Sequence, residues 1–208
     1  MVCKRRYGSY LPVAMDDKKG LYKRPLYLDY KDESMLRIIS ILILLYSPAI
    51  FADKFGSNAN YKVCFTPSEA CTDLIVTAIN QAKSEVLVQA YSFTSMPIAK
   101  ALAQAHKRGV AVKVILDKSQ YRQGGFSSAK MFNDYHIPLW IDYRPTIAHN
   151  KVMVIDNNQV ITGSFNFTRA AQEKNAENVL LISDSVLAKK YKNNWQERLQ
   201  ESETFDQY

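Results

Sequence analysis

The spacing of apolar residues changes repeatedly between residues 67 and 200. In 67–84, Leu74, Ile75, Ala78 and Ile79 recur at helical spacing. Similar reasoning predicts further helices at 96–108, 127–135 and 184–200. Shorter apolar runs predict strands at 85–93, 110–117, 137–141 and 177–183, with a hairpin inside 149–167. This alternation predicts a single-domain α/β fold, in which a mixed β-sheet is flanked by helices on both faces.

An apolar run near the start of the chain has the order of a secretory signal. Met35 and one arginine precede the run Ile38 to Tyr46, Pro48 interrupts it, and Ala52 is a suitable cleavage residue. The sequence therefore predicts a signal peptide at 35–52 and an exported protein, periplasmic or secreted. An uncleaved anchor or a buried helix is the alternative reading of the same run.

Polar, tyrosine-rich residues 1–34 precede this signal, although a signal is expected to begin a chain. We hypothesise that 1–34 is an over-extended gene start and that Met35 is the initiator. The remaining chain is then divided into a linker at 53–62, a catalytic domain at 63–202 and a tail at 203–208.

The charge of the chain says little about its partner. The whole sequence carries a formal net charge of +7. Residues 53–208 hold 18 Lys and Arg against 15 Asp and Glu, a surplus of only three. The expected folded part is mildly basic, so the total charge does not by itself establish nucleic-acid binding.

Two of the three cysteines stand close together in "CFTPSEAC". A disulfide between Cys64 and Cys71 would suit an oxidising compartment and would tie the incoming chain to a helix beginning near Pro67. Two free buried thiols are the alternative. A zinc site is disfavoured, because no second ligand pair has suitable spacing, and no metal is expected.

The stretch "HNKVMVIDNNQVITGSFNF", residues 149–167, carries the candidate chemistry. Side chains two apart in a strand share a face, so His149 and Lys151 point the same way and Val152 points into a core. Asp156 has the opposite parity and directly precedes Asn157–Asn158, a plausible tight turn. Asp156 is therefore expected to be a framework residue rather than a proton carrier.

The return strand brings further polar groups back beside the histidine. Gly163 leaves room for close backbone approach, and Ser164 and Asn166 share parity, so both can face one ligand. A lysine cation, neutral donors and a histidine suit a phosphate group. Glu177, in "KNAEN", is a candidate to hold the imidazole Nδ1–H and leave Nε2 free to attack. No acidic cluster suitable for Mg²⁺ or Ca²⁺ accompanies the set, which predicts metal-free chemistry.

The other two histidines have simpler explanations. His106 suits the last turn of a helix that Gly109 closes, and His136 precedes a proline-containing loop. Both are expected to have structural or surface roles.

The spacing of these residues resembles the H-x-K-x4-D-x6-G-S-x-N signature of the phospholipase D superfamily. The signature positions are His149, Lys151, Asp156, Gly163, Ser164 and Asn166. The chain resembles small, single-motif Nuc-type bacterial endonucleases from about Cys64 to Arg198, including "AYSFT", "KRGVAVKVILD", "GSFNFT" and "KNAEN". Secreted bacterial proteins called phospholipase D look similar over the same span.

The resemblance implies a mechanism in which one histidine attacks phosphorus to form a phosphohistidine and a second protonates the leaving oxygen. His149 would be nucleophile or acid, Glu177 would orient the imidazole, and the phosphate ligands would be Lys151, Ser164 and Asn166. Because the chain has one copy of the motif, we expect a homodimer whose two His149 residues meet at the two-fold axis.

The motif recognises a phosphodiester and not what hangs from it. Our first expectation is DNA or RNA, cut through backbone contacts, with Tyr121, Arg122, Gln123, Tyr143 and Arg144 supplying cationic and stacking contacts from loops. An ordinary solvated loop is the alternative for those residues. The second expectation is a phospholipid head-group hydrolase, and the third is a non-catalytic nucleic-acid or membrane binder.

Overall fold

The computed structural model describes residues 52–121 and 128–205, and its helices and strands belong to the compact unit Asp53–Tyr208. The expected leader, the signal peptide apart from Ala52, and loop residues Arg122 and Gln123 lie outside the described residues. Among the described helices, none combines the length and apolar character needed to cross a membrane.

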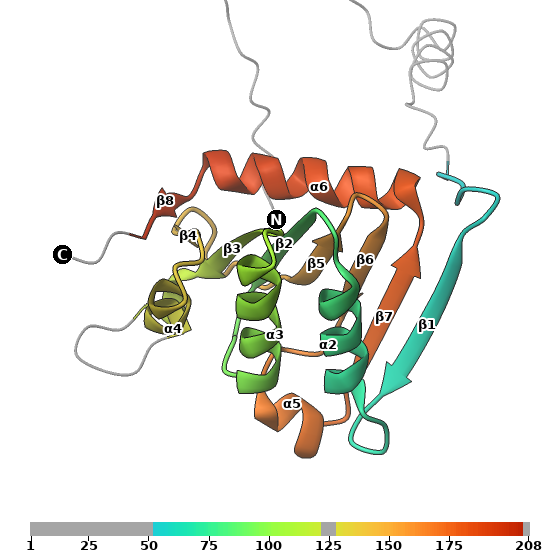
Figure 1. Ribbon diagram of the computed structural model, residues 1–208, viewed down its shortest axis with the longest axis horizontal. Coiled ribbons are helices and arrows are strands. Elements are labelled where there is room, and N and C mark those ends of the chain that lie inside the picture. Colours follow the sequence, from blue (N-terminus) through green and yellow to red (C-terminus); the bar gives the residue numbers. More distant parts are fainter. Residues whose placement is uncertain (1–51, 122–127, 206–208) are drawn as a thin grey trace, which may run out of the picture. The chain divides into compact units, whose positions relative to one another are not determined.

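A single mixed sheet forms the centre of the fold (Figure 1). Its eight strands are arranged in the order β1-β7-β6-β5-β2-β3-β4-β8. Strand β2 pairs in parallel with β3, and β3 with β4, whereas the other pairings are antiparallel. The strands are β1 (Asn60–Phe65), β2 (Glu85–Ala90), β3 (Ala111–Asp117), β4 (Leu139–Asp142), β5 (Lys151–Ile155), β6 (Gln159–Gly163), β7 (Asn178–Ser183) and β8 (Glu203–Thr204).

Helices cover both faces of the sheet, as the sequence predicts. The helices are α2 (Cys71–Gln81), α3 (Met96–Lys107), α4 (Ser128–Asp134), α5 (Arg169–Glu173) and α6 (Ser185–Gln200), with a short 3₁₀ turn η1 (Lys118–Gln120). Figure 1 shows α2 and α3 side by side, and α6 running across the strands. Val86 and Val88 of β2 face the core shared with α2 and α3, whereas Leu87 faces the smaller core under α6. Burial on both faces explains why these strands read as continuous apolar runs.

Helix α6 is fixed to the sheet by polar contacts as well as by packing. The Trp195 indole N–H donates to the Val88 carbonyl at 3.0 Å, and the Arg198 guanidinium makes two hydrogen bonds to the Asp142 carboxylate. Both Trp195 and Asp142 are 2% exposed. Burial without partners would cost free energy, so these pairings hold α6 in one position on the sheet.

Helix α2 begins later than the sequence suggests, at Cys71 rather than near Pro67. The Thr66 N–H donates to the carbonyl of Glu177 instead of entering a helix, and Glu69 N–H donates back to Phe65 O. At the other end, the Asp156 carboxylate takes the Lys83 and Ser84 N–H groups, so the helix stops at Gln81. Tertiary hydrogen bonds therefore override the local helical pattern at both ends.

Three short elements were not predicted: β1, α5 and β8. Strand β1 starts inside the expected linker, and β8 inside the expected tail. The alternation of Tyr61, Val63 and Phe65 was a signal for β1, but only Cys64 of this strand is buried. Helix α5 has five residues and β8 has two, too few to show a period.

The turn between β5 and β6 is one residue earlier than expected. Asp156 and Asn157 have φ values of 52° and 54°, and Asn158 N–H donates to Ile155 O at 3.0 Å. Two successive residues with positive φ are typical of a type I′ hairpin turn, which asparagine and aspartate tolerate.

The Asp156 side chain points away from the candidate chemistry, in agreement with its strand parity. Its carboxylate accepts from the N–H groups of Lys83, Ser84 and Glu85 at 2.8–3.0 Å, and from the Ser84 hydroxyl at 2.8 Å. Burial alone would raise the pKa of Asp156, but these donors outweigh it and lower the pKa below the ordinary 3.8. The carboxylate thus connects the hairpin to the start of β2.

We expect Asp156→Asn to lower the free energy of unfolding by about 1–2 kcal/mol, because the amide loses the charge and places an NH₂ group against N–H donors. Urea denaturation at neutral pH measures this. The contribution of Asp156 is present above the ordinary carboxyl pKa and is lost as pH falls through its lowered folded value, so the difference between the two proteins should shrink in acid. Asp134→Asn, in an exposed ion pair with Lys130, is the control and should change stability by less than about 1 kcal/mol. Equal effects of both substitutions would contradict the framework role of Asp156.

Candidate functional site

The candidate residues gather at one end of the strands, on the side of the sheet where β5 and β7 begin and β1, β2 and β6 end. Lys151 pairs with Ala90, the last residue of β2, and Gly163 pairs with Val179 near the start of β7. The antiparallel pairing thus brings together segments that lie far apart in the sequence.

His149 and Lys151 are in direct contact. The Lys151 Nζ lies 3.2 Å from His149 Nε2 and donates to the His149 carbonyl at 3.0 Å. An ammonium group has only donors, so this contact suits the tautomer whose Nε2 carries the lone pair. His149 itself precedes β5 and is exposed, which leaves its imidazole open to a ligand.

Lys151 is unusually buried for a lysine, with 7% of its surface exposed. Its Nζ lies 5.0 Å from the centroid of the Tyr91 ring, and that ring packs against the His149 imidazole at 4.5 Å between centroids. Burial lowers the pKa of Lys151 below the ordinary 10.5, while the negative charge of Glu177 acts in the opposite direction. The site therefore holds a desolvated cation whose natural partner is an anion.

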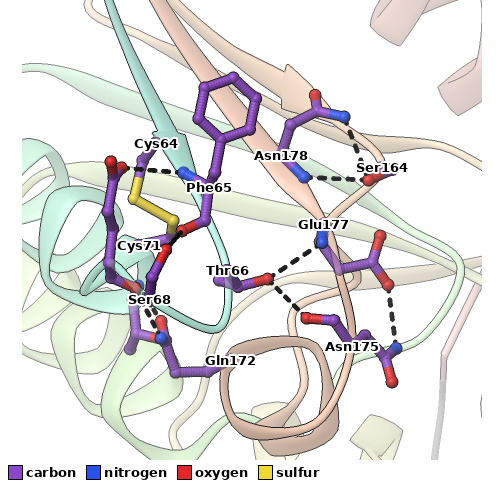
Figure 2. Close-up of a disulfide and its surroundings, with 12 residues drawn as sticks. Cys64, Phe65, Thr66, Ser68, Cys71, Ser164, Gln172, Asn175, Glu177 and Asn178 are labelled. Atoms are coloured by element: carbon purple, nitrogen blue, oxygen red, sulfur yellow. Dashed lines mark hydrogen bonds between the residues drawn. A yellow bond between two sulfur atoms is a disulfide. The ribbon is translucent and has the colours of Figure 1, made fainter.

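Ser164 is held by the neighbouring strand. Its hydroxyl oxygen accepts from the Asn178 backbone N–H at 3.1 Å and from the Asn178 side-chain amide at 3.3 Å (Figure 2). With two donors already directed at its oxygen, the Ser164 O–H remains to donate to a ligand.

Gly163 permits this close approach of β6 and β7. Its φ is 146°, and a Cβ at this position would lie 2.2 Å from the Asn178 carbonyl oxygen. Any side chain would separate the two strands, so the structure confirms the expected reason for this glycine.

Asn166 and Ser164 are not related by strand parity, because β6 ends at Gly163. Asn166 is partly buried, and within the described residues its side-chain oxygen is buried without a hydrogen-bond partner. A buried orphan of this kind is costly, which suits a residue that meets a group from outside the chain.

Glu177 lies near the site, but the expected bond to His149 is not formed in the single chain. Its carboxylate accepts from the Asn175 side-chain amide at 2.9 Å, and no hydrogen bond joins it to the imidazole in the described part of the chain. It does influence Lys151 electrostatically. The role of Glu177 as orienter of the imidazole therefore stays a prediction.

The expected substrate-contacting residues come from two loops, and Tyr121 of the first loop lies near Tyr143 of the second. Tyr121 is 41% exposed and packs against Phe205, with ring centroids 5.6 Å apart. Tyr143 is 40% exposed and Arg144 is exposed, and both stand in the segment that leads to His149. The pKa of Tyr143 is raised, first by burial and then by the charges of Glu203 and Tyr121. The two tyrosines are therefore close enough to interact electrostatically.

The structure contains the Cys64–Cys71 disulfide, which joins β1 to the first residue of α2 (Figure 2). The Glu69 carboxylate lies beside it, so that ligand atoms of the three residues fall within 4.8 Å of one another. Metal binding by cysteine requires thiolates, which disulfide sulfurs are not, so this group is not a metal centre in the oxidised chain.

Sequence reasoning gave no role to three residues that shape the site: Tyr91, Asp117 and Asn178. The buried Asp117 carboxylate accepts from Ala148 N–H at 2.6 Å and from Ser119 N–H at 2.8 Å, which holds the segment before His149. Each of the three stands at or beside the end of a strand on this side of the sheet. Their positions next to strand ends could be read from the sequence. These positions point to a common site only once the order of the strands in the sheet is known.

The remaining histidines lie where the sequence predicts. His106 is in the last turn of α3, which ends before Gly109 with φ 91°, and His136 follows α4 as an exposed residue with φ 56°. Neither contacts the site among the described residues.

Comparison with known proteins agrees with this arrangement. The family described as "Cardiolipin synthase, PLD-like domain" matches residues 75–199. A protein named phospholipase D from Rickettsia typhi is 47% identical over 139 residues, covering 67% of this chain and 68% of that protein. Mitochondrial cardiolipin hydrolase from Xenopus laevis is 32% identical, covering 67% of each chain. The crystal structure of Nuc, a phospholipase D family member from Salmonella typhimurium, has a TM-score of 0.67 at 36% identity, covering 72% of this chain and all of that one.

We expect the affinity for inorganic phosphate to fall as pH rises through the lowered pKa of Lys151, because only the ammonium form attracts the anion. Calorimetric titration above about pH 9 isolates this effect, since inorganic phosphate is by then almost entirely in its doubly charged form. Lys151→Met should weaken binding roughly 10- to 100-fold and should remove the pH dependence. Lys100→Met, on the exposed side of α3, is the matched control. Unchanged phosphate affinity in Lys151→Met would contradict the assignment of the anion site.

Proposed function

The chain belongs to the phospholipase D superfamily and is a phosphodiester hydrolase, and on this premise we propose that it cleaves DNA or RNA through a phosphohistidine at His149, without a metal ion. The observation that carries the proposal is the contact between the Lys151 ammonium and His149 Nε2 at 3.2 Å. It places an anion-binding cation against a nucleophile whose side chain is exposed.

The two steps follow from the groups at the site. His149 Nε2 attacks phosphorus, a P–N bond forms, and the bond from phosphorus to the leaving oxygen breaks as a second imidazolium gives that oxygen a proton. The second imidazole, now neutral, takes a proton from water as the water oxygen attacks phosphorus. The P–N bond then breaks and His149 is restored. Lys151 and the Ser164 hydroxyl stabilise the charge on the non-bridging oxygens throughout.

The second imidazole is best supplied by another copy of the chain. One chain carries one motif, and within the described residues the Glu177 carboxylate is not bonded to its own His149. A two-fold axis beside the site would bring in a second His149 and a second Glu177. The exposed side chains of Tyr61, Val63 and Phe65 on edge strand β1 offer an apolar surface for such a partner, and Phe65 pairs with Asn178 at the site.

Nucleic acid is the preferred substrate because the site is open. His149 and Ser164 are exposed, and Tyr121, Tyr143 and Arg144 provide exposed aromatic and cationic groups suited to bases and backbone phosphates. The second candidate is a phospholipid head group, favoured by the name of the 47%-identical Rickettsia typhi relative. The disulfide supports export to an oxidising compartment, periplasmic or extracellular.

We expect the purified protein to cut plasmid DNA or RNA at an unchanged rate in EDTA, because lysine supplies the charge that a metal would otherwise supply. Phosphatidylcholine vesicles should remain intact in parallel reactions. His149→Ala should reduce turnover by a factor on the order of 10³ or more, whereas His136→Ala should not. Choline release with intact DNA would move the assignment to the phospholipid reading, and tight binding without turnover would favour a non-catalytic binder.

We expect the active protein to be a dimer by size-exclusion chromatography with light scattering, since the reaction needs two imidazoles. Specific activity should fall on dilution as the dimer dissociates. A strictly monomeric protein with full specific activity at every dilution would refute the shared site.

A further inference from the structure

The loop between β1 and α2 is closed by the disulfide and lies against the site. Cys64 and Cys71 are 6% and 0% exposed, and their Cα atoms are 5.6 Å apart. Inside the loop, the Phe65 N–H donates to the Glu69 carboxylate at 2.9 Å, and Glu69 N–H donates to the Phe65 carbonyl at 3.0 Å. The loop is thus held together by its own hydrogen bonds as well as by a covalent bond.

Thr66, in the middle of this loop, makes three hydrogen bonds to the segment 175–177, and Figure 2 shows the two that its hydroxyl makes. Its N–H donates to the Glu177 carbonyl at 3.0 Å, and its hydroxyl donates to the Asn175 carbonyl at 3.0 Å. The same hydroxyl oxygen accepts from the Glu177 N–H at 3.1 Å. Thr66 is 5% exposed, so water does not readily replace these partners.

A second connection joins the loop to α5. The Gln172 side-chain amide donates to the Glu69 carbonyl at 2.8 Å, and its oxygen accepts from Thr72 N–H at 2.9 Å. The chain between α5 and β7 is therefore held at two points: Thr66 of the loop bonds to residues 175–177, and Gln172 of α5 bonds to the loop and to the start of α2.

The segment held in this way carries Glu177 and Asn178. Asn178 directs two donors at the Ser164 hydroxyl oxygen, and the Glu177 charge acts on Lys151. Resting on the proposed function, we propose that Thr66, held in a loop that the Cys64–Cys71 disulfide closes, is the positioning residue that places Glu177 and Asn178 at the phosphate site. Both cysteines are buried, and their disulfide closes the loop from which Thr66 reaches this segment.

Loss of the Thr66 hydroxyl should have an electrostatic signature. The groups that face the Lys151 ammonium are the His149 imidazole, the Tyr91 ring and the Glu177 carboxylate. Of these, Glu177 alone raises the pKa of Lys151. If the segment moves and Glu177 withdraws, the pKa of Lys151 falls further. On a diester whose leaving group departs without a proton, activity that needs the ammonium is then lost at lower pH.

The test compares variants on bis(4-nitrophenyl) phosphate, a diester with neither bases nor acyl chains. Thr66→Val should lower kcat about 10- to 100-fold, the scale of a small misplacement of reacting groups, and should move the alkaline limb of the pH profile to lower pH. Thr66→Ser, which keeps the hydroxyl, should restore both. Cys64→Ala/Cys71→Ala should change kcat and the alkaline limb in the same direction as Thr66→Val.

Asp184→Ala is the matched control, because Asp184 is also buried and accepts two backbone N–H bonds, from Gly56 and Leu187, but at the opposite end of β7. It should lower the melting temperature without moving the alkaline limb. A wild-type profile in Thr66→Val, or the same shift in Asp184→Ala, would overturn the positioning role. A wild-type profile in the double cysteine variant would overturn the part given to the disulfide.

Hydrogen exchange separates this inference from the proposed function. The amides of Glu177 and Asn178 should exchange faster in Thr66→Val than in the wild type, whatever the substrate. If the wild type hydrolyses no diester, the proposed function fails, and the exchange comparison still decides whether Thr66 holds the segment. Unchanged exchange in Thr66→Val would overturn the inference even in an active enzyme.

Discussion

The close approach of β6 and β7 at Gly163 is the contact on which the site depends. With no Cβ at Gly163, the Asn178 carbonyl can lie where a side chain would otherwise stand, and Asn178 can direct both of its donors at Ser164. A wider separation would leave the Ser164 hydroxyl without a fixed orientation. The same pairing sets where β7 begins, and so where Glu177 lies relative to Lys151.

Around that contact, the fold uses polar groups in two distinct ways. Asp156, Asp117 and Thr66 are satisfied by backbone groups and hold the hairpin, the segment before His149 and the segment 175–177. Lys151 and Asn166 are only partly satisfied within the chain. Buried polar groups normally find partners, so the incomplete satisfaction of Lys151 and Asn166, close to one another at one end of the strands, suits a surface that meets a ligand or a second copy.

The alternation of side chains along a strand correctly predicted the directions of Lys151 and Asp156 at the two ends of β5. It failed for the residues that follow β6. It separated Asp156 from Lys151, and both lie as expected. It could not relate Ser164 to Asn166, because both follow the end of β6. The sequence "CFTPSEAC" allowed either a disulfide or two free thiols, and the disulfide is formed. Because residues 65–70 form the loop that it closes, α2 begins at Cys71 and not near Pro67.

By itself, the sequence determined the α/β class, the two-sided burial of the central strands and the residues of the HxK motif, because these depend on local periodicity and on short spacings. Only the tertiary structure decided that Tyr91 packs on His149, that Asn178 holds Ser164, and that Thr66 holds the segment before β7. These partners are separated by 14 to 111 positions in the chain. Their meeting follows from the order in which strands pair, which no local pattern encodes, because hydrogen bonding between strands depends on which edges meet and not on sequence distance.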